Sequence, residues 1–361
     1  MIIIYSISVL LILLYLSYPF WLMLYPDNNN EHETTFEEVN NVSLILLSYN
    51  GKEYLAEKIK FLINEMRCFN HYELIIVDDH STDGSRELLK KINYNKHVRL
   101  ILQDKHHGIP HSMNLGVELA RYNNIIFCDQ RQTLSENIIQ KIVEPLKNKN
   151  VGAVSGCISH LNKFNACSWV RKHENYIKSL ESKSGNLIGV YGPFYAIRKD
   201  SYTIIPEDIV LDDLYLSLKI IQSKQIRIIE DCQIFDDGFS TLYDYGRARR
   251  YVRGFLQILK EKDFLNKLSI RQLTMLIWHK YLRLLIPFSL FLSYFATGVM
   301  GTLHHEYLLA FIIMTVIAIV STIPGLKNKV RLANLISVNV FYLIAVSDIS
   351  IKALLFNKDK R

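Results

Sequence analysis

Two adjacent carboxylates at the end of a predicted strand are the first residues with evident chemistry. Asp78 and Asp79 follow a short apolar run and precede a turn that ends in Gly84. In an open α/β sheet, the carboxyl ends of the strands present ligand-binding groups, and carboxylates suit ribose hydroxyls, base donors or a metal ion. A solvated turn whose aspartate caps the next helix fits the same residues equally well.

Polar side chains also follow two other predicted strands. Ser48 and Asn50 come after one apolar run, and Asp129 and Arg131 come after a later one. Because the carboxyl ends of parallel strands lie at one edge of a sheet, these side chains can converge on a single ligand.

The elements that must position these residues alternate between strands and helices. Strands are predicted at residues 42–47, 74–77, 98–102 and 124–128. Helices are predicted at residues 53–66, 86–92 and 112–121. This alternation predicts an α/β fold with a mostly parallel, doubly wound sheet.

Long apolar runs flank this predicted domain. They cover residues 2–24, 281–300, 307–323 and 332–356. A helix needs about 20 apolar residues to cross the hydrocarbon core of a bilayer. The first run lacks the basic start and the small-residue cleavage site of a signal peptide, so we expect an uncleaved anchor. The fourth is interrupted by Asp348 and Lys352, and it fits either a crossing or a partly interfacial segment.

The charge of the chain points to a membrane rather than to nucleic acid. The formal net charge is +7, and basic residues gather before the second apolar run and between the third and fourth. By the positive-inside rule both clusters are cytoplasmic, so we expect a multi-pass protein of the cell (inner) membrane with its central domain in the cytoplasm. No basic stripe interleaves with aromatic residues, which argues against nucleic-acid binding.

The five cysteines add little, because their number is odd and no spacing resembles a zinc site. Unpaired cysteines suit a reducing compartment.

The expected domain organisation has six parts. They are an N-terminal anchor at residues 1–25, a linker at 26–41, the central domain at 42–260, an amphipathic or interfacial segment at 261–280, membrane helices making two or three crossings at 281–356, and a basic tail at 357–361.

Several short motifs occur in the order typical of one enzyme family. They are Ser48-Tyr49-Asn50, VDDHSTDGS, GIPHSMN, FCDQRQ, VGAVSG, YGPFYAIR and LDDLYLSLKI. With these motifs the chain resembles family 2 glycosyltransferases of the GT-A fold, in particular bacterial membrane-bound members related to polysaccharide synthases. The resemblance covers residues 42–257. It implies a Rossmann-like, mostly parallel sheet in a cytoplasmic domain flanked by transmembrane helices.

The resemblance implies roles for individual residues. Asp213, the second acid of LDDLYLSLKI, corresponds to the general base. Asp79 is implied to contact the base or ribose, and Asp78 to be structural. The other positions implied in nucleotide-sugar binding are Ser48, Asn50, Asn114, Asp129, Arg131, Arg250 and Arg253. The positions implied near the acceptor are Trp169, Gly192 and Asp212, although an ordinary amphipathic helix explains Trp169 equally well.

Two motifs depart from the family pattern. FCDQRQ stands where the family carries the Asp-x-Asp that holds a divalent cation. Asp129 alone suffices for Mg²⁺ or Mn²⁺ if donor phosphates and waters complete the shell; alternatively, Arg131 itself supplies part of the charge. RRYVRGFLQ stands where synthases carry Gln-x-x-Arg-Trp. The missing tryptophan argues against a processive polymer channel, while Arg250 and Arg253 suit a diphosphate.

The activity implied by the resemblance is inverting transfer of a sugar from a nucleotide-diphosphate donor, with UDP as the expected nucleotide. The implied acceptor is a hydroxyl of a saccharide or of a lipid-linked acceptor, in the synthesis of surface polysaccharide or glycolipid. Two alternatives stay open. One is transfer of a single sugar to a polyprenyl-phosphate carrier, and the other is an inactive membrane subunit that only binds nucleotide sugars. The sequence specifies neither an oligomeric state nor an export partner.

Overall fold

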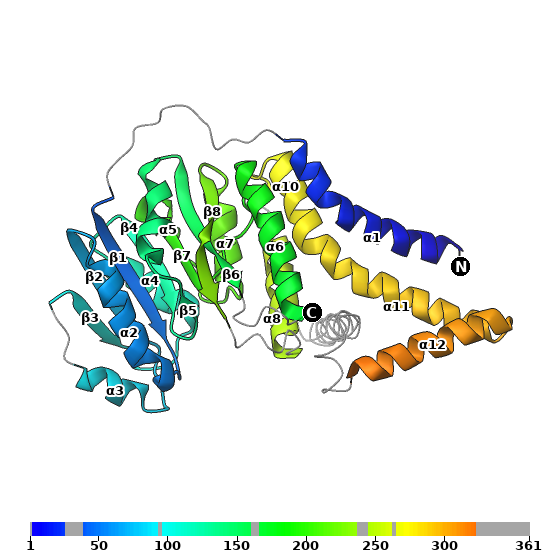
Figure 1. The fold of residues 1–361 in the computed structure, drawn as a ribbon, viewed down its shortest axis with the longest axis horizontal. Coiled ribbons are helices and arrows are strands. Elements are labelled where there is room, and N and C mark those ends of the chain that lie inside the picture. Colours follow the sequence, from blue (N-terminus) through cyan, green and yellow to red (C-terminus); the bar gives the residue numbers. More distant parts are fainter. Residues whose placement is uncertain are drawn as a thin grey trace, which may run out of the picture. The chain divides into compact units, whose positions relative to one another are not determined.

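The computed structural model describes residues 2–25, 39–92, 96–159, 166–236, 245–261 and 265–322 (Figure 1). The chain divides into two compact units. One comprises Tyr25–Leu161 and Arg171–Asp237, and the other comprises Met1–Leu24, Asn162–Val170 and Gly238–Arg361. The predicted fourth apolar run at 332–356, the basic tail and most of the linker lie outside the described residues.

The first unit is built on one sheet with the strand order β3-β2-β1-β4-β7-β6-β8-β5. The strands are β1 (Asn41–Ser48), β2 (His71–Asp78), β3 (Val98–Leu102), β4 (Asn124–Asp129), β5 (Thr133–Leu134), β6 (Val151–Ser159), β7 (Phe194–Arg198) and β8 (Gln225–Phe235). The four strands from β3 to β4 are parallel, whereas β7 runs antiparallel to both β4 and β6. The sheet is therefore mixed, and the prediction of parallel pairing holds for its first half.

Helices connect the strands of this unit. They are α2 (Lys52–Met66), α3 (Ser85–Lys91), α4 (Ile109–Leu119), α5 (Ile138–Val143) with the 3₁₀ turn η2 (Glu144–Lys147), α6 (Ala166–Lys183), the 3₁₀ turn η3 (Lys199–Ser201) and α7 (Asp212–Ile220). The central strands are buried on both faces, as parallel strands covered by helices are; Leu44, Ile45 and Leu46 have no exposed surface. Every strand and helix predicted between residues 42 and 128 is present.

The second unit is helical. Its described helices are α1 (Ile2–Met23), α8 (Tyr245–Lys260), α10 (Ile270–Leu276), the π-helical turn η5 (Ile277–Tyr281), α11 (Leu282–Gly301) and α12 (His305–Thr322). Among the described residues, Ile3–Met23 and Ile270–Gly301 are long and apolar enough to cross a membrane. The second begins before the predicted apolar run, because Ser269 and Gln272 form a capping box at its start.

Hydrogen bonds join α1 to α11. The Ser8 hydroxyl lies 2.7 Å from that of Ser293 and donates to the Ser289 carbonyl at 2.9 Å. The hydroxyls of Tyr5 and Thr297 lie 2.7 Å apart. Small and hydroxylated residues are typical of contacts between membrane helices, where they allow close approach and supply hydrogen bonds.

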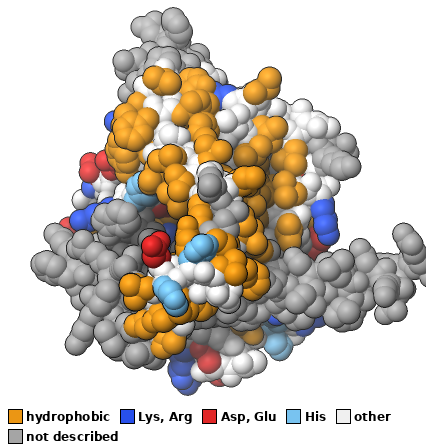
Figure 2. Space-filling view, turned by 90° about the vertical axis from the view of Figure 1, so that its right-hand side faces the viewer, with side chains coloured by type: hydrophobic (Ala, Val, Ile, Leu, Met, Phe, Trp, Pro, Cys, Tyr) orange, Lys and Arg blue, Asp and Glu red, His pale blue; other side chains and the backbone are white. Residues whose placement is uncertain are grey.

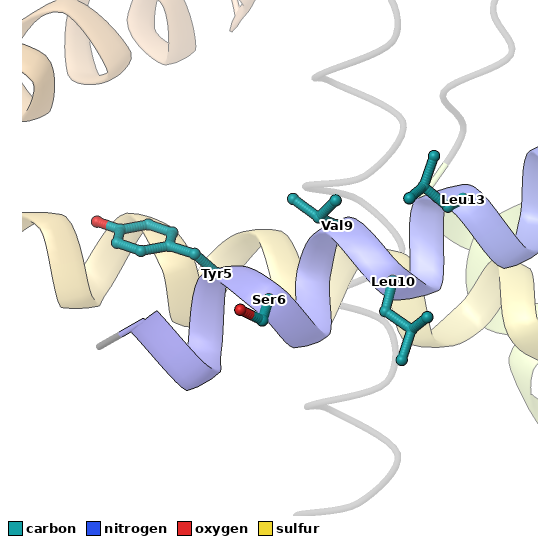
Figure 3. Close-up of a pocket in the computed structure, with 5 residues that line it drawn as sticks. All are labelled: Tyr5, Ser6, Val9, Leu10 and Leu13. Atoms are coloured by element: carbon teal, nitrogen blue, oxygen red, sulfur yellow. The ribbon is translucent and has the colours of Figure 1, made fainter.

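The outward faces of these helices are apolar. Figure 2 shows hydrophobic side chains gathered on the face it views, and among the exposed ones in α1, α11 and α12 are Leu13, Phe20, Phe295, Leu309 and Ile319. A pocket on this unit is lined by Tyr5, Ser6, Val9, Leu10 and Leu13, all from α1 (Figure 3). Its lining contains no carboxylate and no basic group, so it offers no side chain for acid–base chemistry.

Candidate active site

Three strand ends meet at one edge of the sheet, as the sequence predicts. β1 lies between β2 and β4, and all three are parallel. The register pairs Ser48 with Asp78 and Leu47 with Asp129, so the last residues of the three strands lie side by side. This edge carries most of the residues proposed from the sequence to bind the donor.

Asp78 organises the turn that follows β2. Its carboxylate has no exposed surface. It accepts hydrogen bonds from the Ser81 amide at 3.1 Å, the Ser81 hydroxyl at 2.5 Å and the Ser48 hydroxyl at 3.3 Å. Three donors on one buried carboxylate compensate for its desolvation. Ser48 therefore directs its hydroxyl to Asp78, and its contact with a nucleotide stays a prediction.

Asn50 connects the loops after β1 and β2. Its side-chain carbonyl accepts from the Thr82 amide at 2.8 Å, and its own backbone amide donates to the Ser81 hydroxyl at 3.0 Å. The residue has φ = 46°, a left-handed conformation that asparagine tolerates better than most residues. The sequence motif Ser-Tyr-Asn thus builds the shape of this edge.

Asp79 holds the loop that precedes α4. Its two carboxylate oxygens accept the backbone amides of His107 and Gly108, each at 2.7 Å, and His106 Nδ1 lies 2.8 Å from Oδ2. Gly108 has φ = 95°, a conformation available mainly to glycine. The His106 ring stacks on Tyr49, with ring centroids 4.3 Å apart. The sequence predicted a nucleoside contact for Asp79 but not these three partners.

The neighbouring histidines form a second small cluster. The rings of His107 and His111 stack with centroids 4.0 Å apart. His107 Nε2 lies 3.2 Å from an oxygen of Asp104, and this hydrogen bond lowers the pKa of the Asp104 carboxyl. Among the described residues, no group of three or more His, Cys, Asp or Glu side chains is arranged to hold a metal ion.

The segment from Asp129 to Gln132 alternates between buried and accessible side chains. Gln130 and Gln132 are buried, whereas Arg131 is exposed and Asp129 is partly exposed. Gln130 donates to the Tyr49 carbonyl at 2.7 Å, and Gln132 donates weakly to Asp236 at 3.4 Å. The two buried glutamines hold the segment against the interior of the domain, and Asp129 and Arg131 lie on its accessible side.

A divalent cation fits this edge only if the donor supplies ligands. Asp129 is the one carboxylate of the segment, and it ends β4 with a backbone bond from its amide to the Pro193 carbonyl at 2.9 Å. Mg²⁺ in phosphate sites is commonly held by one or two carboxylates, with phosphate oxygens and waters completing its shell. The partly exposed Asp129 meets that requirement, and Arg131 beside it supplies a positive charge on the same side.

The acidic pair Asp212–Asp213 opens α7. Asp212 is 8% exposed, and Asp213 is partly exposed, with its Oδ1 accepting the Leu214 amide at 2.8 Å. A Cβ atom added to Gly192 would lie 3.3 Å from Asp213 Oδ2. The structure therefore brings together Gly192 and Asp213, which the sequence separates by about twenty residues and which the resemblance implies for acceptor binding and catalysis.

Tyr195 of β7 pairs in the sheet with Phe127, two residues before Asp129. Its side chain is 1% exposed, and burial raises its pKa well above the ordinary tyrosine value. The nearby groups Asp212, Tyr202, Asp213 and Asp129 raise the pKa of Tyr195 further. The charges of the three carboxylates implied in the chemistry thus all raise the pKa of one phenol. Sequence reasoning missed this residue, because in YGPFYAIR it is only one apolar-strand position among several.

Asn114 holds the segment that follows η3. Its amide nitrogen donates to the Ile205 carbonyl at 2.8 Å, and its oxygen accepts from the Tyr202 hydroxyl at 2.6 Å and the Ile205 amide at 3.0 Å. All three partners are internal. Donor binding by Asn114 accordingly stays a prediction.

Three proposed residues belong to the helical unit. Arg250 and Arg253 are exposed on α8, which belongs to the helical unit. Trp169 lies in the first part of α6, and its side chain is outside the described part of the structure. Their roles at the diphosphate and the acceptor stay predictions.

Part of the chain is similar in sequence to a known protein family. The model for glycosyl transferase family 2 matches residues 43–204. Glycosyltransferase GlyG of Streptococcus pneumoniae serotype 4 is 27% identical over 116 residues, which are 32% of this chain and 38% of that protein. Poly-beta-1,6-N-acetyl-D-glucosamine synthase of Staphylococcus aureus (strain COL) is 21% identical over 201 residues, which are 53% of this chain and 48% of the synthase. The chain thus spans less than half the length of these relatives.

Among solved structures, the mannosyltransferase PcManGT from Pyrobaculum calidifontis, in complex with GDP-Man and Mn²⁺, has a TM-score of 0.74 at 17% identity. The match covers 95% of this chain and 98% of that chain, so it extends beyond the sheet domain. At this identity the likeness concerns the fold. Residues 43–204 are thus similar to glycosyl transferase family 2, and the chain shares its fold with this mannosyltransferase.

Proposed function

We propose that the protein is an inverting glycosyltransferase that moves a sugar from a nucleotide-diphosphate donor, with UDP as the expected nucleotide, to an acceptor hydroxyl. The observation that carries this proposal is that Asp129 and Asp213 meet at one segment of the region similar to family 2. The Asp129 amide donates to the Pro193 carbonyl at 2.9 Å, and the adjacent Gly192 lies against Asp213. One strand end is suited to the diphosphate, and the acidic pair is suited to an acceptor.

In the proposed reaction Asp213 is the general base. Its partly exposed carboxylate takes the proton of the acceptor hydroxyl as that oxygen attacks the anomeric carbon. The bond from that carbon to the diphosphate oxygen breaks in the same displacement, so the configuration inverts. A positioned base of this kind contributes about 10²–10⁴-fold to the rate.

Charge on the departing diphosphate must be stabilised in the transition state. Asp129 would hold a Mg²⁺ or Mn²⁺ ion, which when bound neutralises the diphosphate. Arg131 adds a positive charge and planar donors suited to phosphate oxygens. The exposed Arg250 and Arg253 of α8 are further candidates for diphosphate contacts.

We propose a saccharide or lipid-linked acceptor in the synthesis of surface polysaccharide or glycolipid. The long apolar helices support work at a membrane surface, and similarity to a poly-beta-1,6-N-acetyl-D-glucosamine synthase supports hexosyl or N-acetylhexosaminyl transfer. A polyprenyl-phosphate carrier is the alternative acceptor. The two differ in product, since the carrier would receive one sugar only.

A donor screen tests the proposal. Membranes that contain the full chain are incubated with a panel of UDP- and GDP-sugars, and transfer and hydrolysis are measured. We expect turnover of at least one donor, its loss to background in Asp213→Asn, and no change in the matched surface variant Glu118→Gln. EDTA should stop turnover and Mn²⁺ should restore it; turnover that survives EDTA would contradict the metal assignment. If wild type and Asp213→Asn bind UDP equally and are equally inert, the protein is a binding subunit instead.

A further inference from the structure

Lys58 carries its charge into the interior of the sheet domain. It lies on α2 and is 8% exposed, whereas Glu57 and Lys60 of the same helix are exposed. Charged side chains are almost never fully buried without a partner, because removing a charge from water is costly. The position of Lys58 therefore calls for a contact that offsets its desolvation.

The contact of Lys58 is with the segment that carries Asp129 and Arg131. The Lys58 ammonium donates a hydrogen bond to the backbone carbonyl of Gln132, 74 residues further along the chain. Gln132 is 3% exposed, so both partners of this hydrogen bond lie inside the domain. A buried side chain of α2 thus holds the backbone at the end of segment 129–132.

Segment 129–132 depends on such contacts, because little of it is regular structure. β4 ends before Gln130 and β5 begins after Gln132. The side-chain amides of these two glutamines also hold the segment, but both are neutral donors. A hydrogen bond from an ionised donor is roughly twice as strong as one from a neutral donor. Lys58 therefore holds the segment more strongly than either glutamine.

The position of this segment matters for donor binding. Asp129 is the proposed ligand of the metal ion, and Arg131 is proposed to contact the diphosphate. Asp129 is the only carboxylate of the segment, so no second acid can keep the ion in place if the backbone shifts. Small misplacements of a functional group are costly. The hydrogen bond from Lys58 fixes the backbone three residues after Asp129.

We propose that Lys58 is a positioning residue for donor binding, whose buried ammonium holds the segment so that Asp129 and Arg131 meet the metal ion and the diphosphate. This inference deepens the proposed function and rests on it. Lys58 acts through the backbone of Gln132, because its own side chain is buried. Loss of Lys58 should therefore weaken the binding of nucleotide and metal.

The test is Lys58→Met in the full-length protein, because methionine keeps an unbranched apolar stem and removes the ammonium. UDP, or GDP in a parallel series, is titrated in the presence of MnCl₂, and the melting temperature is followed. We expect the nucleotide concentration at half-maximal stabilisation to rise about tenfold, as for loss of one hydrogen bond to a charged group. The donor KM should rise by a similar factor. A half-maximal concentration equal to that of wild type would overturn the proposal.

Lys199→Met is the matched control. The Lys199 ammonium also donates to a backbone carbonyl, that of Ala120 at 2.6 Å, but Ala120 precedes β4 whereas Gln132 follows it. Both variants should lower the melting temperature of the ligand-free protein, and Lys199→Met should leave the half-maximal nucleotide concentration unchanged. If both variants raise that concentration equally, loss of stability explains the effect and the positioning role is wrong.

Two further variants separate the contact from net charge and from folding. Lys60→Met removes the same charge from an exposed position of α2 and should leave nucleotide binding unchanged. A loss of affinity equal to that of Lys58→Met would assign the effect to net charge and overturn the proposal. Lys58→Gln, whose amide is neutral and one atom shorter, serves if Lys58→Met does not fold.

Nucleotide binding by Lys58→Gln should still be weaker than that of wild type, and equal binding would overturn the proposal. The same titration separates this inference from the proposed function. A wild type that gains no stability from either nucleotide and turns over no donor would defeat the proposed function. Equal half-maximal concentrations in wild type and Lys58→Met would defeat only the role of Lys58.

Discussion

At the scale of single residues, the site depends on a close approach between a glycine and the proposed base. Gly192 precedes β7, and Asp213 opens α7. The space between them leaves little room for a side chain, because a Cβ atom added to Gly192 would lie 3.3 Å from Asp213 Oδ2. That distance is shorter than an ordinary contact, so any larger residue must displace the carboxylate.

Gly192→Ala should therefore reduce turnover more than stability. The added methyl group moves the Asp213 carboxylate by a few tenths of an ångström, and small misplacements of a catalytic group are costly. We expect kcat to fall about tenfold to a hundredfold, with the free energy of unfolding lower by about 1 kcal/mol. Gly189→Ala is the control, since its Cβ would meet Leu214 at an ordinary 3.7 Å. Equal activity in the two variants would remove Gly192 from the site.

At the scale of elements, the loops around the sheet edge are joined by contacts between residues distant in sequence. Strands β1 to β4 were predictable because each is a short apolar run in a buried parallel sheet. The partners of Asp79 and Asn114 were not, since they lie 27–29 and 88–91 residues further along the chain. The later strands were unpredictable in direction, because an antiparallel insertion such as β7 leaves no mark in the hydrophobic pattern.

The loop after β1 is closed by a second tight contact. A Cβ on Gly51 would overlap the side-chain nitrogen of Gln130, the buried residue between Asp129 and Arg131. Gly51→Ala should displace Gln130, lower the free energy of unfolding by about 1–3 kcal/mol and weaken donor binding. The double variant Gly51→Ala/Gln130→Ala should recover much of the stability, measured by thermal unfolding. If the single variant is as stable as wild type, the segment is not held in this way.

A clamp between β7, η3 and the turn after α7 should respond to acid. Burial by itself raises the pKa of Asp200, but hydrogen bonds from Arg198 and Lys224 lower it to about 2. An unfolded aspartate titrates near 3.9, so the stability due to this clamp is present above about pH 4 and is lost as the pH falls toward 2. The side chain is 46% exposed, so screening limits the contribution to about 1 kcal/mol.

Asp200→Asn should accordingly lower the free energy of unfolding by about 1 kcal/mol at pH 7. The difference from wild type should shrink between pH 4 and pH 2. Unfolding in urea at several pH values measures it. A difference that stays constant down to pH 2 would show that charge on Asp200 is not its cause.

At the scale of the whole molecule, the side of the membrane on which the sheet domain lies can be tested with its own thiols. Burial raises the pKa of Cys128 to about 11 and those of Cys157 and Cys232 to about 12. These thiols therefore form little thiolate and react poorly with maleimides in the folded protein. Cys68 is exposed. The domain between the apolar segments therefore contains one accessible cysteine among those that the structure describes.

In a Cys167→Ser background, we expect Cys68 in intact cells to react with a membrane-permeant maleimide and not with an impermeant one. This follows if the domain is cytoplasmic, as the positive-inside rule predicts. Opening the cells should make both reagents effective, and Cys68→Ser should abolish labelling. Labelling of intact cells by the impermeant reagent would place the domain outside.

The contact between Ser8 and Ser293 has a consequence for how the protein is made. These two residues are separated by 285 positions, and the entire sheet domain lies between them. At a synthesis rate of about 5–20 residues per second, α1 waits roughly 15–60 s for its partner helix to leave the ribosome. During that interval the sheet domain can fold while it is held by its amino terminus alone. The contact between α1 and α11 therefore forms only after the sheet domain has been synthesised.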